Sequence, residues 1–194
     1  MAESKFSPMN VGDSAGAGFG SITLSVAALN AVPFMNRMMI IPVTVATVAA
    51  LCVAALGATV TDLGPWYQAL AKPAWNPPDV VFPMGWTVIY ALITVAGITA
   101  WRAAHTSAQA EWVLGLFALN GFLNITWSIL FFRFQRPDWA FWEVTLLWLS
   151  ILAIIFYVVR FSRGAALLLV PYLVWVSFAA ALNWAVVQLN APFG

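Results

Sequence analysis

Aromatic side chains with polar tips recur at helical spacing in the most apolar stretches of this sequence. Phe82, Trp86 and Tyr90 follow one another at intervals of four residues, which would stack them on one face of a helix. At similar spacing, Asn120, Asn124 and Trp127 would share one helix face. Such rings are poor groups for tight helix packing. They are good walls for a flat aromatic ligand, since small-molecule pockets are mostly apolar with a few placed polar groups.

A further aromatic position lies near the C-terminus, where Trp175, Ala179 and Asn183 would fall on one stripe of a helix. The small residues 179–181 would leave space beside the indole ring. A side-chain amide in hydrocarbon must find a hydrogen-bond partner, because an unpaired one costs several kcal/mol. The alternative is that these side chains only pack helix against helix, and the sequence leaves that alternative open.

Conventional catalytic machinery is missing from the sequence. It contains no nucleophile–base pair, no P-loop, no Gly-rich dinucleotide motif and no His/Cys/Asp/Glu cluster with metal-ligand spacing. The single cysteine, Cys52, excludes an internal disulfide, and His105 falls in a short polar turn. Glu143 lies one turn into an apolar run, where it either snorkels to the membrane interface or marks a proton or ligand site.

An aromatic, proline-rich stretch covers residues 66–90, WYQALAKPAWNPPDVVFPMGWTVIY. Proline fixes φ, removes a backbone donor and disfavours the helical region for the residue before it, so residues 73–78 cannot form a regular helix. The stretch is nevertheless too aromatic for a solvated linker, because each Trp or Tyr ring gains roughly 2–3 kcal/mol on leaving water. We therefore expect a rigid loop that folds back as a lid on a helix bundle.

The composition excludes a soluble domain. The chain has 194 residues, of which 63% are hydrophobic and only 8% charged, against roughly 25% charged residues in soluble domains. A formal net charge of +1 provides no basic face for nucleic acid.

Apolar runs of about 20 residues, the length of one membrane crossing, recur along the chain. They predict an all-α membrane protein, a bundle of five transmembrane helices at about residues 38–60, 80–103, 111–132, 139–159 and 165–189. Short loops would make neighbouring helices antiparallel, and a proline at position 171 would kink the last one. Small residues in the first run would let neighbouring helices approach closely. Residues 38–190 would thus form one transmembrane domain, preceded by a poorly ordered extension at 1–37 without a good transit signal. A bacterial cell membrane is therefore expected rather than an organelle.

Four motifs along the chain resemble one known family. They are KPAWNPP at Lys72–Pro78, FPMGWTVIY at Phe82–Tyr90, Asn124 with Trp127, and PYLVW at Pro171–Trp175. In this order they resemble the TspO/MBR family of tryptophan-rich sensory proteins, related to the mitochondrial translocator protein or peripheral-type benzodiazepine receptor. The resemblance covers about residues 39–190.

The resemblance implies a five-helix bundle, usually a homodimer, in which the first loop covers a pocket. It implies porphyrins such as protoporphyrin IX as ligands, with no obligatory cofactor and no metal. Carried over by position, the ligand-binding residues would be Trp66, Tyr67, Phe82, Trp86, Tyr90, Asn124, Trp127, Trp175 and Ala179. In some bacterial members a light-dependent breakdown of protoporphyrin is attributed to two tryptophans that match Trp86 and Trp175, which would be catalytic only in that case.

The sequence departs from the family pattern at three places. Ala74 stands where many bacterial relatives have a second aromatic residue. The C-terminal ALNWAVVQLN lacks the Tyr and the Arg of the animal cholesterol motif, so cholesterol binding is not expected. The small-xxx-small pattern of a dimer face is incomplete, since Gly115 is followed four residues later by Leu119.

Three functions are compatible with these observations. The first is a porphyrin-binding membrane protein that senses, traffics or scavenges the pigment. The second is an enzyme that degrades porphyrin with light and oxygen, which would need no acid–base machinery. The least favoured is a small secondary transporter, because no repeat is evident and Glu143 is the only acid expected within a span.

Overall fold

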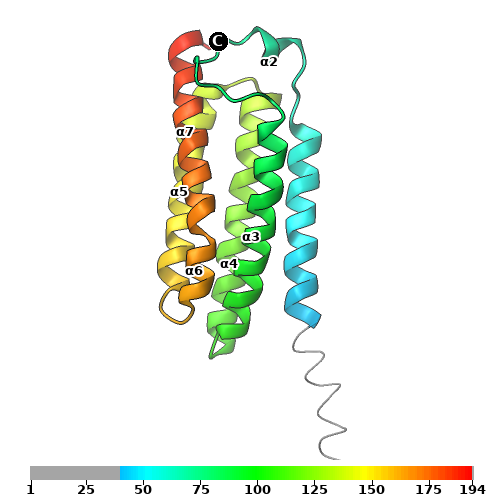
Figure 1. Ribbon diagram of the computed structural model, residues 1–194, viewed down its shortest axis with the longest axis vertical. Coiled ribbons are helices and arrows are strands. Elements are labelled where there is room, and N and C mark those ends of the chain that lie inside the picture. The colour runs from blue at the N-terminus through cyan, green and yellow to red at the C-terminus, as the bar shows by residue number, and fades with distance from the viewer. Residues whose placement is uncertain (1–39, 194) are drawn as a thin grey trace, which may run out of the picture. The chain divides into compact units, whose positions relative to one another are not determined.

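The computed structural model describes residues 40–193, so the expected N-terminal extension lies outside the described residues. Within that range the regular structure is helical, and five helices are long and apolar enough to cross a membrane. This confirms the predicted all-α membrane fold (Figure 1).

The first spanning helix, Ile40–Val60, is drawn without a label in cyan in Figure 1. A short helix, α2 (Pro65–Ala69), lies in the first loop, which the sequence predicted as structured but not as helical. The remaining elements are α3 (Val81–Ala103), α4 (Ser107–Ser128), the π-helical turn η1 (Ile129–Arg133), α5 (Pro137–Val158), α6 (Arg163–Leu168) and α7 (Val170–Asn190).

Local sequence signals set the helix ends. The Thr106 hydroxyl accepts a hydrogen bond from the Gln109 backbone N–H at 3.2 Å, so α4 begins four residues before the expected position 111. Pro137 occupies the first turn of α5, where a missing N–H costs nothing. The kink predicted at Pro171 is a break at Leu169, which separates α6 from α7 and places Pro171 in the first turn of α7.

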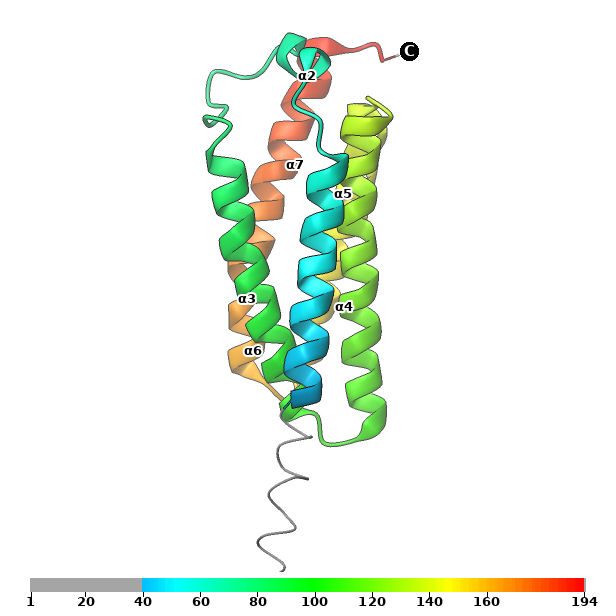
Figure 2. The same cartoon turned by 90° about the vertical axis from the view of Figure 1, so that its right-hand side faces the viewer.

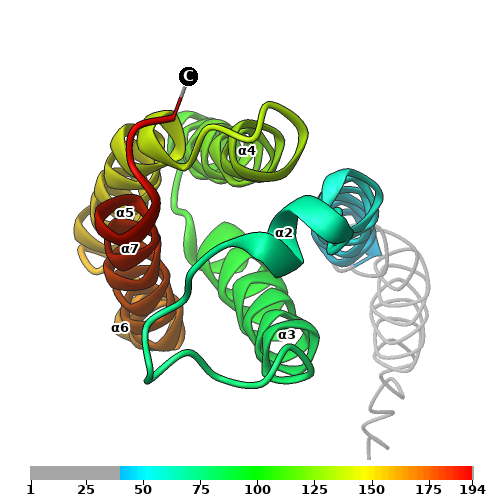
Figure 3. The same ribbon diagram turned by 90° about the horizontal axis from the view of Figure 1, so that it is seen from above.

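The spanning helices follow one another around the bundle in the order first helix, α3, α7, α5 and α4 when seen along their axes (Figure 3). The centre is apolar and closely packed, with Val144, Ile151, Tyr172 and Val176 all about 1% exposed or less. The first loop and the C-terminal end of α7 lie at the same end of the bundle (Figure 2).

The first helix and its neighbours enclose two cavities. A Cβ on Gly121 of α4 would lie 3.0 Å from the Val53 side chain, which marks one close approach. Most of the small residues of this helix instead line these cavities. Ala54, Gly57 and Ala58 line one of them, and Ala46, Ala49 and Ala50 line the other. The expectation that they let neighbouring helices approach closely is therefore wrong for most of them.

Candidate functional site

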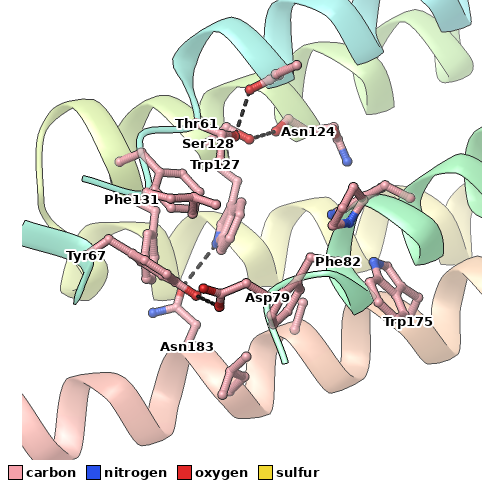
Figure 4. A pocket seen from close by; sticks show the side chains of 18 of the residues that line it. Thr61, Tyr67, Asp79, Phe82, Asn124, Trp127, Ser128, Phe131, Trp175 and Asn183 are labelled. Carbon is pink, nitrogen blue, oxygen red and sulfur yellow. Dashed lines mark hydrogen bonds between the residues drawn. The ribbon is translucent and has the colours of Figure 1, made fainter. Parts of the chain in front are cut away.

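A cavity of about 510 Å³ lies between the helices beneath the first loop. Its walls come from the first helix, α3, α4, η1 and α7, and residues of the first loop also line it (Figure 4). This volume lies within the roughly 300–1,000 Å³ range of small-molecule sites.

The structure brings the expected site residues together with one exception. Tyr67, Phe82, Trp86, Tyr90, Asn124, Trp127, Trp175 and Ala179 all line the cavity. Trp66 is the exception: its ring packs edge-on against Phe131, with centroids 5.9 Å apart, and so fastens α2 to η1 instead of forming a pocket wall.

Four rings from α3 and α7 form the aromatic wall. Trp86 stacks on Tyr90 at a centroid distance of 5.3 Å, one turn along the helix as the spacing predicted. Trp175 meets Trp86 edge-on at 6.1 Å, and Phe82 meets Trp175 edge-on at 6.4 Å. Phe178 adds a further ring beside Trp175 that the sequence analysis did not include.

Gly85 allows the Trp175 ring to lie directly on α3. A Cβ at this position would lie 2.4 Å from the nearest ring atom, a separation that real Cβ atoms do not adopt. A glycine inside a helix lowers stability by roughly 0.5–1 kcal/mol relative to alanine. A glycine at such a position can therefore indicate, from the sequence alone, that a neighbouring group approaches the backbone closely.

A chain of hydrogen bonds runs from the pocket wall into the centre of the bundle. The Tyr90 hydroxyl donates to Asn124 Oδ1 at 2.9 Å, and Asn124 Nδ2 donates to the Tyr172 hydroxyl at 3.4 Å. That hydroxyl donates to Asn120 Oδ1 at 3.1 Å, and Asn120 Nδ2 donates to the Ser150 hydroxyl at 2.8 Å. Each amide therefore has hydrogen-bond partners on neighbouring helices, and Tyr172 and Ser150 are the members that sequence spacing alone did not identify.

Trp127 is fixed by a second amide. Its indole N–H donates to Asn183 Oδ1 at 3.1 Å, and Asn183 Nδ2 donates to the Pro137 carbonyl at 2.8 Å. Figure 4 shows the Trp127–Asn183 bond. The π-helical turn that follows brings both Phe131 and Phe132 against this ring, at 5.2 and 6.1 Å.

The first loop is held over the cavity at several points. The Asn190 side chain accepts from the Ala71 N–H and donates to the Ala71 carbonyl, both at 2.9 Å. Trp75 packs edge-on against Phe178 at 5.9 Å. Because α7 carries both Asn190 and Phe178, the loop is attached to the helix that also carries part of the pocket wall. We call residues 61–80 the lid.

The first loop contributes one phenol and two charged side chains, Tyr67, Lys72 and Asp79, to the lining of the cavity. Lys72 Nζ donates to the Tyr67 carbonyl at 2.7 Å and lies 4.2 Å from the centre of the Tyr67 ring. The Tyr67 hydroxyl donates to Asp79 at 3.4 Å. Burial and the neighbouring Asp79 carboxylate raise the pKa of Tyr67 to about 12, so the phenol stays neutral at physiological pH.

Glu143 is buried between helices and does not reach the interface. Its side chain is 6% exposed, neither carboxylate oxygen has a hydrogen-bond partner within residues 40–193, and it does not line the cavity. The snorkelling interpretation is therefore wrong. His105, in contrast, is exposed in the turn before α4.

The Glu143→Gln variant should unfold at the same temperature as the wild type or a few degrees higher. In hydrocarbon an ionised carboxylate without a partner costs far more than an unpaired amide of the same shape. Thermal unfolding in detergent at neutral pH measures this, with Glu111→Gln at an exposed position of α4 as the matched control. A fall of several degrees for Glu143→Gln alone would show that the carboxylate has a stabilising partner.

Fold and site together define a class: a polytopic membrane protein whose five helices surround an aromatic pocket closed by a proline-rich lid. Residues 43–189 match the sequence model of the TspO/MBR family. The chain belongs to that family, which confirms the resemblance found in its motifs.

Curated relatives come from bacteria and from animals. The tryptophan-rich protein TspO of Chlorobaculum tepidum is 42% identical over 130 residues, which cover 64% of this chain and 79% of the relative. The tryptophan-rich sensory protein of Cereibacter sphaeroides is 36% identical over 125 residues, covering 64% and 77%. The translocator protein of Ovis aries is 35% identical over 126 residues, covering 64% and 75%.

Proposed function

We propose that this protein binds a planar tetrapyrrole of the protoporphyrin IX type in the pocket beneath the lid. The observation that carries the proposal is the perpendicular pair formed by Trp86 and Trp175, with Tyr90 stacked on Trp86, around a cavity of about 510 Å³. A macrocycle can stack on one ring and meet the edge of another, which are the arrangements that aromatic pairs prefer.

Polar groups at the cavity suit the edge of such a pigment. The Trp175 indole N–H is buried and has no hydrogen-bond partner within the described part of the chain, so a ligand acceptor would relieve a cost of about 1–3 kcal/mol. Asn124 Oδ1 accepts one hydrogen bond, from Tyr90, and has a second lone pair for a pyrrole N–H of the pigment. The lid covers these groups, and a bound pigment that displaced water from beneath it would strengthen each polar contact.

The biological role that fits this proposal is sensing, trafficking or scavenging of porphyrins within a membrane. The names of the relatives from Cereibacter sphaeroides and Ovis aries, a sensory protein and a translocator, agree with it. We propose a bacterial cell membrane as the compartment.

Replacing either wall tryptophan tests the proposal. Trp86→Phe and Trp175→Phe each keep an aromatic ring but remove indole area and the N–H, so we expect protoporphyrin IX affinity to fall about tenfold, corresponding to about 1.4 kcal/mol. Equilibrium titration in detergent in the dark measures the affinity. The matched control is Trp142→Phe on α5, where the ring is 73% exposed. Equal affinities for wild type and both wall variants would refute the proposed site.

A second candidate is light- and oxygen-dependent degradation of the bound porphyrin, with the pigment as its own sensitiser. The observation in its favour is that two oxidisable indoles, Trp86 and Trp175, meet at 6.1 Å in the same pocket wall. Product formation with many turnovers per chain under illumination would support an enzyme. Bleaching that stops after about one equivalent would mark incidental photochemistry.

A further inference from the structure

A second cavity, of about 430 Å³, lies on the other side of the Tyr90–Asn124 pair, between the first helix, α3 and α4. It follows the first helix from Pro42 to Val53, which at 1.5 Å per residue is a length of about 16 Å. Alanines of the first helix form one wall, and Gly97 and Phe117 line the opposite side. We call this cavity the groove.

The groove and the lidded pocket are separate spaces that meet at two residues. Tyr90 and Asn124 line both, and their hydrogen bond of 2.9 Å lies between them. Asn120 and Tyr172 line the groove alone. The polar end of the groove is therefore the hydrogen-bonded chain at the centre of the bundle, and its remaining walls are mostly apolar.

The amides at this end have donors to spare. Asn120 Nδ2 gives one N–H to Ser150, and Asn124 Nδ2 gives one to Tyr172. Each amide nitrogen carries two N–H groups, and no other described residue accepts the second one of either amide. Asn120 and Asn124 lie four residues apart on α4 and both line the groove, so two spare donors at one end of an apolar space fit a single acceptor oxygen.

Charge distinguishes the groove from the lidded pocket. Lys72 and Asp79 line the pocket, whereas none of the described residues that line the groove is charged. An ionised ligand would find no counter-ion there, and the cost of an unpaired charge in hydrocarbon excludes it. Exposed side chains of α4, Leu114 and Phe122, form the rim on the lipid side, so a molecule dissolved in the membrane has access.

We propose that the groove is a second binding site, for an uncharged, elongated lipid with one acceptor oxygen, such as a long-chain ketone, aldehyde or alcohol. The oxygen accepts from the Asn120 and Asn124 amides, and the chain extends along the alanines of the first helix toward Trp101. This site does not depend on what occupies the pocket under the lid.

Photolabelling of the full chain in lipid nanodiscs tests the groove. The probe is a long-chain methyl ketone with a diazirine in mid-chain, and its matched probe is the hydrocarbon with the same diazirine but no oxygen. We expect the ketone to label peptides around Ala50 and Phe117 in a saturable manner, and the hydrocarbon to label them about tenfold less. Equal labelling by the two probes would overturn the proposal, because the amides would then recognise no oxygen.

Substitutions that fill the groove provide a second test of the proposal. Ala50→Leu extends a side chain into it from the first helix, and Ala118→Leu does so from α4. Each is expected to reduce saturable ketone labelling about tenfold. Ala55→Leu, on an exposed face of the first helix that lines neither cavity, should leave it unchanged. Labelling that survives both filling variants, in protein whose helix content matches the wild type, would contradict the groove as the binding site.

Discussion

Gly85→Ala is expected to lower the affinity for protoporphyrin IX by tenfold or more. The added Cβ would lie 2.4 Å from the Trp175 ring, so the ring has to move. It cannot move freely, because Trp86, Phe82 and Phe178 all pack against it. Overpacking of this kind costs about 1–3 kcal/mol, and the displaced ring would occupy part of the cavity. Dark titration with protoporphyrin IX measures the loss, and near-ultraviolet circular dichroism reports the altered indole environment.

Gly115→Ala is the matched control for this variant. Both positions are glycines within spanning helices, but a Cβ at Gly115 meets no atom within 4 Å. We expect wild-type affinity and equal or slightly higher stability, because alanine is the better helix former. An unchanged affinity for Gly85→Ala would mean that the Trp175 ring takes no part in binding.

Asn190→Ala is expected to release the lid. The wild-type amide accepts from and donates to the backbone of Ala71, both at 2.9 Å, and alanine abolishes both bonds. At about 1 kcal/mol for each bond, and less at this partly exposed position, the lid should open about tenfold more often. Dissociation of bound protoporphyrin IX, followed by stopped-flow fluorescence, should be faster by a similar factor, with little change in thermal stability.

Gln188→Ala is the control for the lid, since its side chain is exposed near the same helix end. Hydrogen exchange adds a readout that does not depend on the ligand: amides of residues 70–80 should lose protection in Asn190→Ala and keep it in the control. Dissociation rates that are the same in Asn190→Ala and wild type would show that the lid is held elsewhere.

Much of the fold follows from local sequence. The apolar runs predict all five crossings because each has the length, about 20 predominantly apolar residues, of one membrane span. Local residues set where three helices begin. Thr106 and Ser162 cap the N-termini of α4 and α6, and Pro137 is the first residue of α5. The π-helical turn at Ile129–Arg133 was not predictable in this way, because it depends on how Trp127 and the two phenylalanines pack in three dimensions.

The site was predictable to the extent that it lies on single helices. A spacing of four residues places Trp86 and Tyr90 on one face, and the structure stacks them. Which residues meet across helices depends on how the helices are shifted relative to one another, and sequence periodicity does not determine this. For that reason the sequence did not predict that Tyr172 joins the amide chain or that Trp66 packs on η1. For Glu143, distance along the helix suggested the interface, but its side chain faces the centre of the bundle.

The central claim is that the rings under the lid enclose one planar pigment. Titration of protein tryptophan fluorescence with protoporphyrin IX in detergent, in the dark and then under illumination, tests it most directly. We predict saturable quenching in the dark with one pigment bound per chain, strongly weakened by Gly85→Ala and unchanged in Gly115→Ala. Quenching that rises without saturation, to the same extent in wild type and Gly85→Ala, would contradict the claim, because the pigment would then be dissolved in the detergent around the helices.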